Sequence, residues 1–188
     1  DLDRLDLCLT ALTQQRGVPD FEIVVADNMS PVGEEAVRRL IADRAKLTIA
    51  TERGAGPARN AGVAAAAGTT LAFTDCDCLP DPGWLDAGIA ALAQHDLVGG
   101  RMYVYVPQGR AMNGAEAFER LFAFDNRDYV RKKGFTVTAN LFCSRTLFDA
   151  VGPFRTGVSE DMEWCHRARA NGYRLGYAED AVVGHPPR

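Results

Sequence analysis

Two carboxylates, Asp75 and Asp77, stand at the end of the apolar run 70–74, where a buried strand is expected to reach the surface. Hard divalent cations such as Mg²⁺ and Mn²⁺ take oxygen ligands and keep open positions for substrate phosphates. In open α/β sheets, ligands bind at the carboxyl ends of strands. Aspartate before Pro80 and Pro82 is also a common turn former, and short acidic motifs often occur by chance. The pair predicts a site for a metal-bound diphosphate, with a plain turn as the alternative.

A second group of polar residues opens an expected helix. The stretch Gly54-Ala-Gly-Pro-Ala-Arg59 follows a strand, as a dinucleotide-binding fingerprint does. Arg59, however, stands where that fingerprint needs a third glycine for close helix packing, which disfavours NAD. Because a helix N-terminus attracts anions, we expect Arg59 and Asn60 to meet a nucleotide. The alternative is that Arg59 is merely exposed.

Two more acidic residues, Glu160 and Asp161, follow Ser159 in the first turn of another expected helix. Carboxylates there complement the helix dipole, which gives them an ordinary structural explanation. The same dipole lowers their basicity unless burial or a neighbouring carboxylate raises the pKa. His185 stands alone near the end of the chain and has both structural and metal-binding explanations.

Strands and helices alternate through the first half of the chain. Leu5, Leu9 and Leu12 repeat at helical spacing, and Pro82 suits a first helical position after Asp81. The expected helices are 2–15, 34–45, 56–67 and 82–93, and the expected strands are 21–26, 46–50 and 70–74. This order predicts an α/β fold with a doubly wound, mostly parallel central sheet.

The second half of the chain is less regular, and mixed strand pairing is expected there. The expected strands are 97–100, 102–106, 136–144, 173–177 and 181–183, and the expected helices are 115–124 and 159–170. No internal repeat, low-complexity tract or linker interrupts the sequence. With 188 residues, of which 47% are apolar, the chain fits a single domain, residues 1–188.

Charge and cysteine content exclude several classes of protein. A net charge of -4, with no basic run longer than 131–133, argues against a nucleic-acid surface, and those basic residues are expected in a solvated loop. No apolar run reaches the roughly 18 residues that span a bilayer, so any membrane association is expected to be peripheral. The five scattered cysteines suit a reducing compartment, so we expect a cytoplasmic protein, at most at the inner face of the membrane. A zinc site from Cys76 and Cys78 with Cys165-His166 lacks Cys-x-x-Cys spacing and is disfavoured.

The ordered set of motifs resembles family 2 glycosyltransferases of the GT-A fold. The matching stretches are Phe21-Glu-Ile-Val-Val-Ala-Asp-Asn-Met-Ser30, Gly56-Pro-Ala-Arg-Asn-Ala-Gly62, Phe73-Thr-Asp-Cys-Asp-Cys-Leu-Pro-Asp-Pro-Gly-Trp-Leu85, Thr138-Ala-Asn140, Val151-Gly-Pro-Phe154, and Glu160-Asp161 through His185. They follow the family order over nearly the whole chain. The resemblance implies a Rossmann-like fold with a nucleotide-binding half, about 1–100, and an acceptor-binding half, about 101–188.

The resemblance also implies roles for the polar residues of the first half. Asp27, with Asn28 beside it, matches the carboxylate that contacts the nucleotide base in such enzymes, and Arg59 and Asn60 fall in a segment that lines the nucleotide pocket. Asp75 and Asp77 match the acidic motif: Asp75 lies near the ribose and metal, and Asp77 binds Mn²⁺ or Mg²⁺.

Residues of the second half receive roles in the same way. His185 matches a histidine that completes the metal site in some relatives, and Thr138 and Asn140 fall where relatives form the sugar and acceptor pocket. Asp161 matches the catalytic base of an inverting transfer, with Glu160 sharing or orienting that work. The implied reaction moves a sugar from a nucleotide-diphosphate sugar, with UDP expected, to a saccharide, lipid or small-molecule hydroxyl, as in the synthesis of cell-envelope polysaccharide.

The N-terminus departs from the family pattern. Such enzymes begin with a strand and loop that carry part of the nucleotide site, whereas this sequence begins with the helix that follows them. The strands 21–26 and 70–74 would then face a gap. Buried backbone groups without partners cost about 1 to 3 kcal/mol each, against a total domain stability of about 5 to 15 kcal/mol. We expect residues upstream of Asp1 to fill the gap, with a rearranged sheet or a second chain as alternatives.

Two other functions fit parts of the sequence. A sugar-phosphate nucleotidyltransferase would share the sheet and the acidic metal site but should carry a Gly-rich phosphate loop after its first strand, and no such loop is visible. A non-catalytic module that binds nucleotide sugars would share the fold without turnover. The presence of both Glu160-Asp161 and Asp75-x-Asp77 argues against the second.

Overall fold

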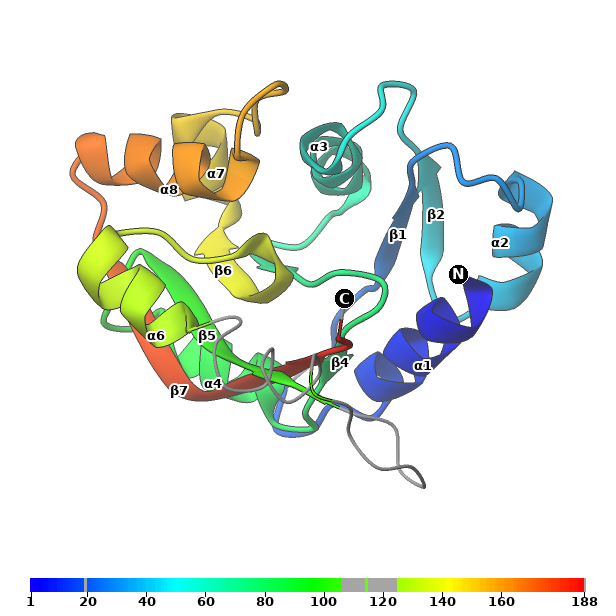
Figure 1. The fold of residues 1–188 in the computed structure, drawn as a ribbon, viewed down its shortest axis with the longest axis horizontal. Coiled ribbons are helices and arrows are strands. Elements are labelled where there is room, and N and C mark those ends of the chain that lie inside the picture. Colours follow the sequence, from blue (N-terminus) through cyan, green and yellow to red (C-terminus); the bar gives the residue numbers. More distant parts are fainter. Residues whose placement is uncertain (19, 106–113, 115–124, 188) are drawn as a thin grey trace.

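Helices and strands alternate from α1 to β3, and the order is less regular in the rest of the chain (Figure 1). The structure is a computed structural model that describes residues 1–18, 20–105, 114 and 125–187. The helices are α1 (Leu2–Thr13), α2 (Glu34–Ile41), α3 (Ala55–Ala65), α4 (Trp84–Ala91), α6 (Asn126–Asp128), α7 (Arg145–Val151) and α8 (Glu160–Ala170). The strands are β1 (Val24–Asp27), β2 (Lys46–Ile49), β3 (Thr70–Phe73), β4 (Leu79–Pro80), β5 (Leu97–Val104), β6 (Leu141–Ser144) and β7 (Leu175–His185).

The strands of the described residues form two sheets. β1 and β2 pair in parallel, and five strands form a second sheet in the order β3-β6-β5-β7-β4. Only β5 and β7 are parallel in the second sheet, because β6 runs opposite to both β3 and β5, and β4 runs opposite to β7. The α/β architecture is therefore confirmed, but parallel pairing is less extensive than the sequence predicts.

β1 and β3 do not pair with each other in the described part of the chain. β1 pairs with β2 alone, and β3 is an outer strand of the larger sheet. The additional strand expected between the strands 21–26 and 70–74 stays a prediction.

Helix α1 packs against elements of both sheets. Its N-cap, Asp1, accepts hydrogen bonds from the backbone N–H groups of Asp3 and Arg4 at 3.1 and 3.4 Å. Leu5 and Leu9 share a hydrophobic cluster with Val37 and Ile41 of α2. The adjacent positions Cys8 and Leu12 belong to a second cluster, which includes Cys78, Trp84 and Val183. Burial of this helix therefore fixes the turn after β3 relative to α2 and the first sheet.

Strand β7 is longer than expected. The two predicted strands 173–177 and 181–183 form one strand, whose pairing with β5 shifts register between Gly100, opposite Ala178, and Arg101, opposite Val182. A Cβ at Gly100 would lie 2.2 Å from the carbonyl oxygen of Ala181, so only glycine allows this approach. The irregularity permits β7 to continue to His185.

The Asn140 side chain hydrogen-bonds to backbone carbonyls of β5 and β7 at this irregularity. Its Nδ2 donates to the carbonyl oxygens of Arg101 and Ala181 at 3.0 and 2.9 Å, and its Oδ1 accepts from Trp84 Nε1 at 2.9 Å. The residue is fully buried. Asn140 thus holds β5, β7 and α4 together, and its amide is already used by the protein.

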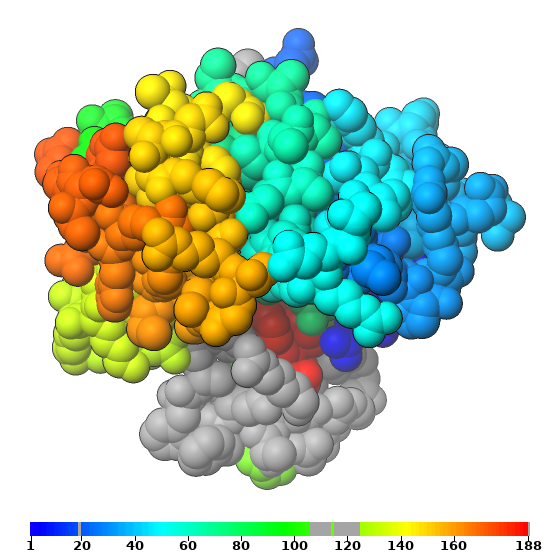
Figure 2. Space-filling view, turned by 90° about the horizontal axis from the view of Figure 1, so that it is seen from above, coloured from blue at the N-terminus to red at the C-terminus, as the bar shows by residue number. Residues whose placement is uncertain are grey.

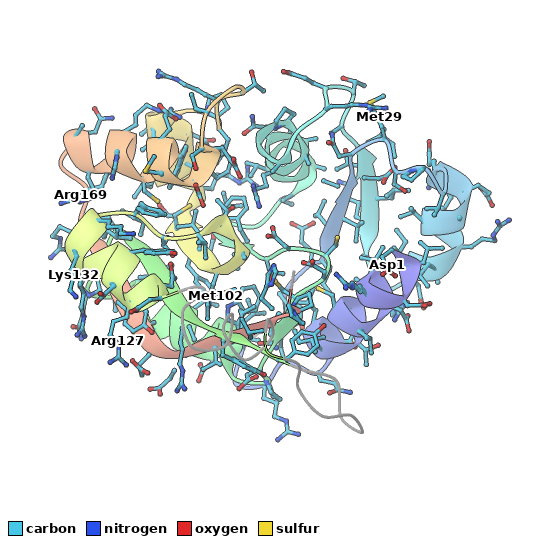
Figure 3. All side chains as sticks on the ribbon, in the orientation of Figure 1. Asp1, Met29, Met102, Arg127, Lys132 and Arg169 are labelled. Atoms are coloured by element: carbon cyan, nitrogen blue, oxygen red, sulfur yellow. The ribbon has the colours of Figure 1, made fainter. Side chains whose placement is uncertain are left out.

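Several other details of the second half differ from the sequence predictions. The expected strand 136–144 begins only at β6, after a 3₁₀ turn at Thr138–Asn140, and α7 is an additional helix. The expected helix 115–124 lies outside the described residues. The basic residues 131–133 form a π-helical turn rather than a loop, where Lys132 pairs with Asp128. Figure 3 shows Lys132 near Arg127 and Arg169, at an edge far from Asp1.

The described helices include none that is long and apolar enough to cross a lipid bilayer.

Replacing Asn140 by alanine is expected to destabilise the fold strongly. The change removes the partner of the buried Ala181 carbonyl, of the buried Trp84 indole N–H and of the partly buried Arg101 carbonyl. Each buried group left without a partner costs about 1 to 3 kcal/mol, so a loss of about 3 kcal/mol or more is expected in urea unfolding. Gln94→Ala, at an exposed position after α4, is the control and should change stability by about 0.5 kcal/mol or less. A loss below about 1 kcal/mol for Asn140→Ala would contradict this role.

Candidate active site

The turn that follows β3 carries both predicted metal-motif carboxylates. The N–H of Cys78 donates to the carbonyl of Asp75 at 3.0 Å, which closes the turn, and the Cys8 thiol donates to the same carbonyl at 3.6 Å. Asp75 and Asp77 are both partly exposed. The sequence prediction that two carboxylates stand where this strand ends is confirmed by their positions.

Arg59 joins two of the predicted acidic residues. Its Nη2 lies 2.7 Å from Asp75 Oδ1, and its Nη1 lies 2.6 Å from Glu160 Oε1. The Arg59 side chain is only 14% exposed. Charge-assisted bonds from a planar guanidinium are directional, so Arg59 fixes the positions of both carboxylates. The first turns of α3 and α8 and the turn after β3 therefore meet at one point.

Asn60 reinforces the same junction. Its Nδ2 donates to the carbonyl of Phe154, and its Oδ1 accepts from the N–H of Phe154, both at 2.9 Å. In Figure 2, α3 lies side by side with the segment that contains α7 and the approach to α8. Both ends of the Asn60 amide are engaged, so the structure gives this residue a positioning role next to the expected nucleotide pocket.

A second group forms around Asp77. One ligand atom each from Asp77, Cys78 and His185 lies within 4.8 Å of the others. Carboxylate and imidazole are ordinary ligands of divalent cations, so the donor atoms fit a metal. Asp75 lies outside this group.

The partners of this group come from α1 and β7. Arg4 Nη1 lies 3.6 Å from Asp77 Oδ2. His185 is buried, and its Nδ1 lies within hydrogen-bond distance of the Pro186 carbonyl. The disfavoured zinc set is not assembled, because the Cys165 thiol contacts the Thr136 carbonyl and His166 contacts the Lys133 carbonyl.

Burial raises the pKa of the thiols around this turn. Burial raises the pKa of Cys8 to about 12, and the neighbouring Cys76 and Asp77 add to the rise. Burial likewise raises the pKa of Cys78, with Asp75 and Asp77 contributing. Cys76 is exposed by surface area, and partial desolvation by the surrounding protein, followed by the nearby Asp77 and Asp75, raises the pKa of its thiol.

The end of β1 carries the residues predicted to contact the nucleotide base. Asp27 is buried, and its two carboxylate oxygens accept from the N–H of Ser30 at 3.3 and 3.4 Å. Asn28 donates to the Glu52 carbonyl at 2.7 Å and accepts from the Gly54 N–H at 2.8 Å. Asn28 therefore ties the end of β1 to the loop that opens α3.

Two buried hydroxyl groups lie close in sequence to Asp27 and Asp75. Ser30 Oγ and Thr74 Oγ1 have no hydrogen-bond partner within the described part of the chain. Buried hydroxyls normally have partners, so both mark polar space at the strand ends.

The structure separates the two acidic residues of α8. Glu160 is held by Arg59, whereas Asp161 Oδ1 accepts from Ser159 Oγ at 3.2 Å and from the Met162 N–H at 2.7 Å. Asp161 is partly exposed at the start of the helix. Thr138 is buried with only 2% exposure, which indicates a place in the framework for this predicted pocket residue, as for Asn140.

Sequence reasoning missed two residues of the site. Arg4 contacts Asp77, and Cys78 joins the group with His185. The helical spacing of Arg4 and Cys8, four residues apart, places them on one face of α1 and could have indicated the first contact. Nothing local in the sequence places Cys78 near His185, since that contact depends on the pairing of β4 with β7.

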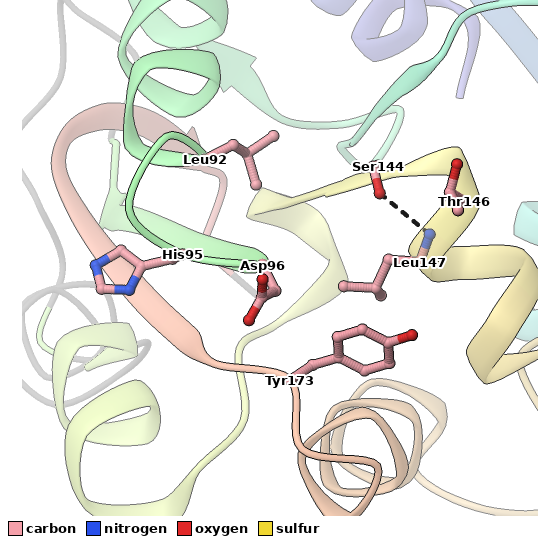
Figure 4. Close-up of a pocket in the computed structure, with 7 residues that line it drawn as sticks. All are labelled: Leu92, His95, Asp96, Ser144, Thr146, Leu147 and Tyr173. Carbon is pink, nitrogen blue, oxygen red and sulfur yellow. Dashed lines mark hydrogen bonds between the residues drawn. The ribbon is translucent and has the colours of Figure 1, made fainter.

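A pocket of about 260 Å³ lies elsewhere (Figure 4) and contains none of the predicted site residues. Its lining residues are Leu92, His95, Asp96, Ser144, Thr146, Leu147 and Tyr173. Asp96 pairs there with Arg174 at 3.4 Å, and Ser144 caps α7 through the Leu147 N–H. These polar groups have structural explanations, so the pocket is not the candidate site.

Comparison with known proteins identifies the family. Residues 2–157 match the model of the family described as "Glycosyl transferase family 2". The chain belongs to this family. Glycosyltransferase AglE of Haloferax volcanii is 32% identical over 200 residues, which cover 100% of this chain and 64% of AglE.

Solved structures of glycosyltransferases share the fold. The mannosyltransferase PcManGT of Pyrobaculum calidifontis, solved with GDP-Man and Mn²⁺, superposes with a TM-score of 0.72 at 23% identity, over 98% of this chain and 53% of that one. TarS 1-349 of S. aureus, solved with UDP-GlcNAc, gives 0.68 at 20% identity, over 98% and 55%. The GT-A fold is thereby confirmed. This chain spans about half to two thirds of the length of these relatives.

Proposed function

We propose that this chain carries the donor site of a metal-dependent, inverting glycosyltransferase that uses a nucleotide-diphosphate sugar. The observation that carries the proposal is the meeting of Asp75, Asp77, Arg59, Glu160 and His185 around the turn after β3, in a member of glycosyl transferase family 2. A cationic guanidinium and a carboxylate–imidazole pair suit a bound diphosphate and its metal. Relatives solved with GDP-Man and UDP-GlcNAc support a nucleotide-sugar donor, and we take UDP as the first candidate.

The proposed binding roles follow the geometry. Asp77 and His185 would hold Mn²⁺ or Mg²⁺, and the ion, when bound, neutralises charge on the departing diphosphate. Asp75 lies in the same turn, held by Arg59, where it would face the ribose and the metal. Asp27, with Asn28 supporting its loop, would accept a hydrogen bond from the nucleotide base.

Asp161 is the proposed general base. In an inverting transfer the acceptor oxygen forms a bond to the anomeric carbon from one face while the bond to the diphosphate oxygen breaks on the other. The acceptor proton passes to a carboxylate. Glu160 is held in an ion pair with Arg59, whereas Asp161 has no ion pair among the contacts of the described residues. Glu160 would then orient the first turn of α8.

The proposed acceptor is a hydroxyl-bearing saccharide, lipid or small molecule. Peripheral membrane association and a role in the synthesis of cell-envelope polysaccharide stay predictions. Family membership argues against a nucleotidyltransferase. A non-catalytic binding module is distinguished from an enzyme by turnover alone.

The direct test is a screen of UDP- and GDP-sugars for slow hydrolysis, which needs no knowledge of the acceptor. We expect one donor to release its nucleoside diphosphate in the presence of Mn²⁺ and to stop doing so when the metal is chelated. Hydrolysis that survives chelation would contradict metal dependence. Binding of donors without any hydrolysis would favour the non-catalytic module.

Two matched substitutions should separate binding from chemistry. Asp77→Asn removes a carboxylate ligand at constant volume, so calorimetric titration with UDP and Mn²⁺ should show affinity lowered by roughly 10-fold or more.

Asp161→Asn should keep wild-type UDP affinity yet lose turnover by roughly 10² to 10⁴, the usual contribution of a positioned general base. Unchanged affinity in the first variant, or near-normal turnover with a confirmed acceptor in the second, would refute the corresponding role.

A further inference from the structure

Cys78 is the third member of the group formed with Asp77 and His185. Its side chain is completely buried, and it belongs to the hydrophobic cluster that also contains Cys8 and Trp84. A buried cysteine in such a place is usually a small apolar core residue. The surroundings of its sulfur, however, are partly polar, because Cys78 Sγ lies 3.9 Å from Asp77 Oδ1.

Strand pairing places Cys78 opposite His185. β4 and β7 are antiparallel, with Pro80 paired to Val183 and Leu79 paired to Gly184. One step further along this register, Cys78 faces His185. Directly opposed residues of an antiparallel pair project to the same face of a sheet. The approach of thiol and imidazole is therefore set by the backbone and not by a flexible side chain.

The spacing of the three ligand atoms suits a single ion. Zinc-type ligands at about 2.0 to 2.3 Å from a tetrahedral ion are roughly 3.3 to 3.8 Å apart. The three atoms here lie within 4.8 Å of one another, so side-chain rotations that draw them together by about 1 Å would suffice. Asp77 can offer its Oδ1 to the ion, because this oxygen lies beside the Cys78 thiol while Oδ2 faces Arg4.

We propose that Cys78 is a thiolate ligand of the metal held by Asp77 and His185, which makes this a mixed oxygen, nitrogen and sulfur site that binds borderline ions such as Zn²⁺ and Co²⁺ more tightly than the Mn²⁺ or Mg²⁺ proposed for the transfer. The inference rests on the proposed metal site of the transferase. On binding, the S–H bond breaks, a metal–sulfur bond forms, and the proton leaves to solvent, as for other cysteine ligands. Thiolate favours softer ions, whereas carboxylate and water suit Mg²⁺ and Mn²⁺.

Cobalt spectroscopy tests the proposal without any measurement of activity. The reduced protein is titrated with Co²⁺, and the visible d–d bands report binding while a near-ultraviolet charge-transfer band reports a cobalt–thiolate bond. We expect both signals in the wild-type protein. In Cys78→Ser the charge-transfer band should disappear, and affinity for Co²⁺ and Zn²⁺ should fall by about 10-fold or more while Mn²⁺ affinity changes little, since even residues outside the ligand shell alter affinity by roughly 10 to 100-fold.

Cys76→Ser is the matched control, because it removes an exposed thiol of the same turn whose sulfur is outside the group. It should keep the charge-transfer band. Thermal unfolding of Cys78→Ser and Cys78→Ala shows whether the buried position tolerates each change, and the spectra of the wild-type protein and of Cys76→Ser together decide the question even if neither variant folds.

The outcomes separate this inference from the proposed function. Cobalt d–d bands in the wild-type protein without a charge-transfer band would overturn the Cys78 assignment and leave the metal site intact. Persistence of the band in Cys78→Ser, or its loss in Cys76→Ser, would also overturn it. Absence of any cobalt spectrum would overturn this inference, and Mn²⁺-dependent hydrolysis of the donor would then decide the proposed function separately.

Discussion

The shared ion pair of Arg59 is the interaction on which the arrangement of the candidate site depends. One guanidinium binds Asp75 and Glu160, which are 85 residues apart in the sequence (160 − 75), and all three side chains are partly buried. Without Arg59, two carboxylates would approach each other with nothing to offset their repulsion. The electrostatic requirement thus holds α3, the turn after β3 and α8 in one place, and Asn60 adds two backbone bonds to the same junction.

The other half of the site depends on strand register. His185 reaches Asp77 and Cys78 because β7 continues past its irregularity at Gly100 and then pairs with β4. Asn140 supports that continuation by donating to the carbonyls of Arg101 and Ala181 at the irregularity. A residue predicted to contact a sugar therefore serves the site indirectly, through the strand that carries a proposed metal ligand.

Local sequence signals were sufficient to predict the helices and strands of the first half of the chain and the kind of chemistry expected at the site. The leucine spacing of α1, the apolar strand before Asp75 and the opening of α3 at Gly54 all depend on neighbouring residues, and all are found close to their predicted places. What the sequence could not provide depends on long-range pairing: the direction of β6, the single strand β7, the full engagement of Asn140, and the contacts of Arg4 and Cys78 with Asp77. These follow from tertiary packing, which periodicity does not encode.

A double-mutant cycle between Arg59 and Glu160 tests most directly the claim that one ion pair organises the site. Unfolding free energies of Arg59→Met, Glu160→Gln and the double variant should give a coupling energy of about 1 kcal/mol or more, in the range found for residues of one network. The exposed pair Arg38 and Glu34 of α2 provides a reference cycle, expected at about 0.3 to 0.5 kcal/mol. A coupling energy for Arg59 and Glu160 within about 0.3 kcal/mol of zero would contradict the account.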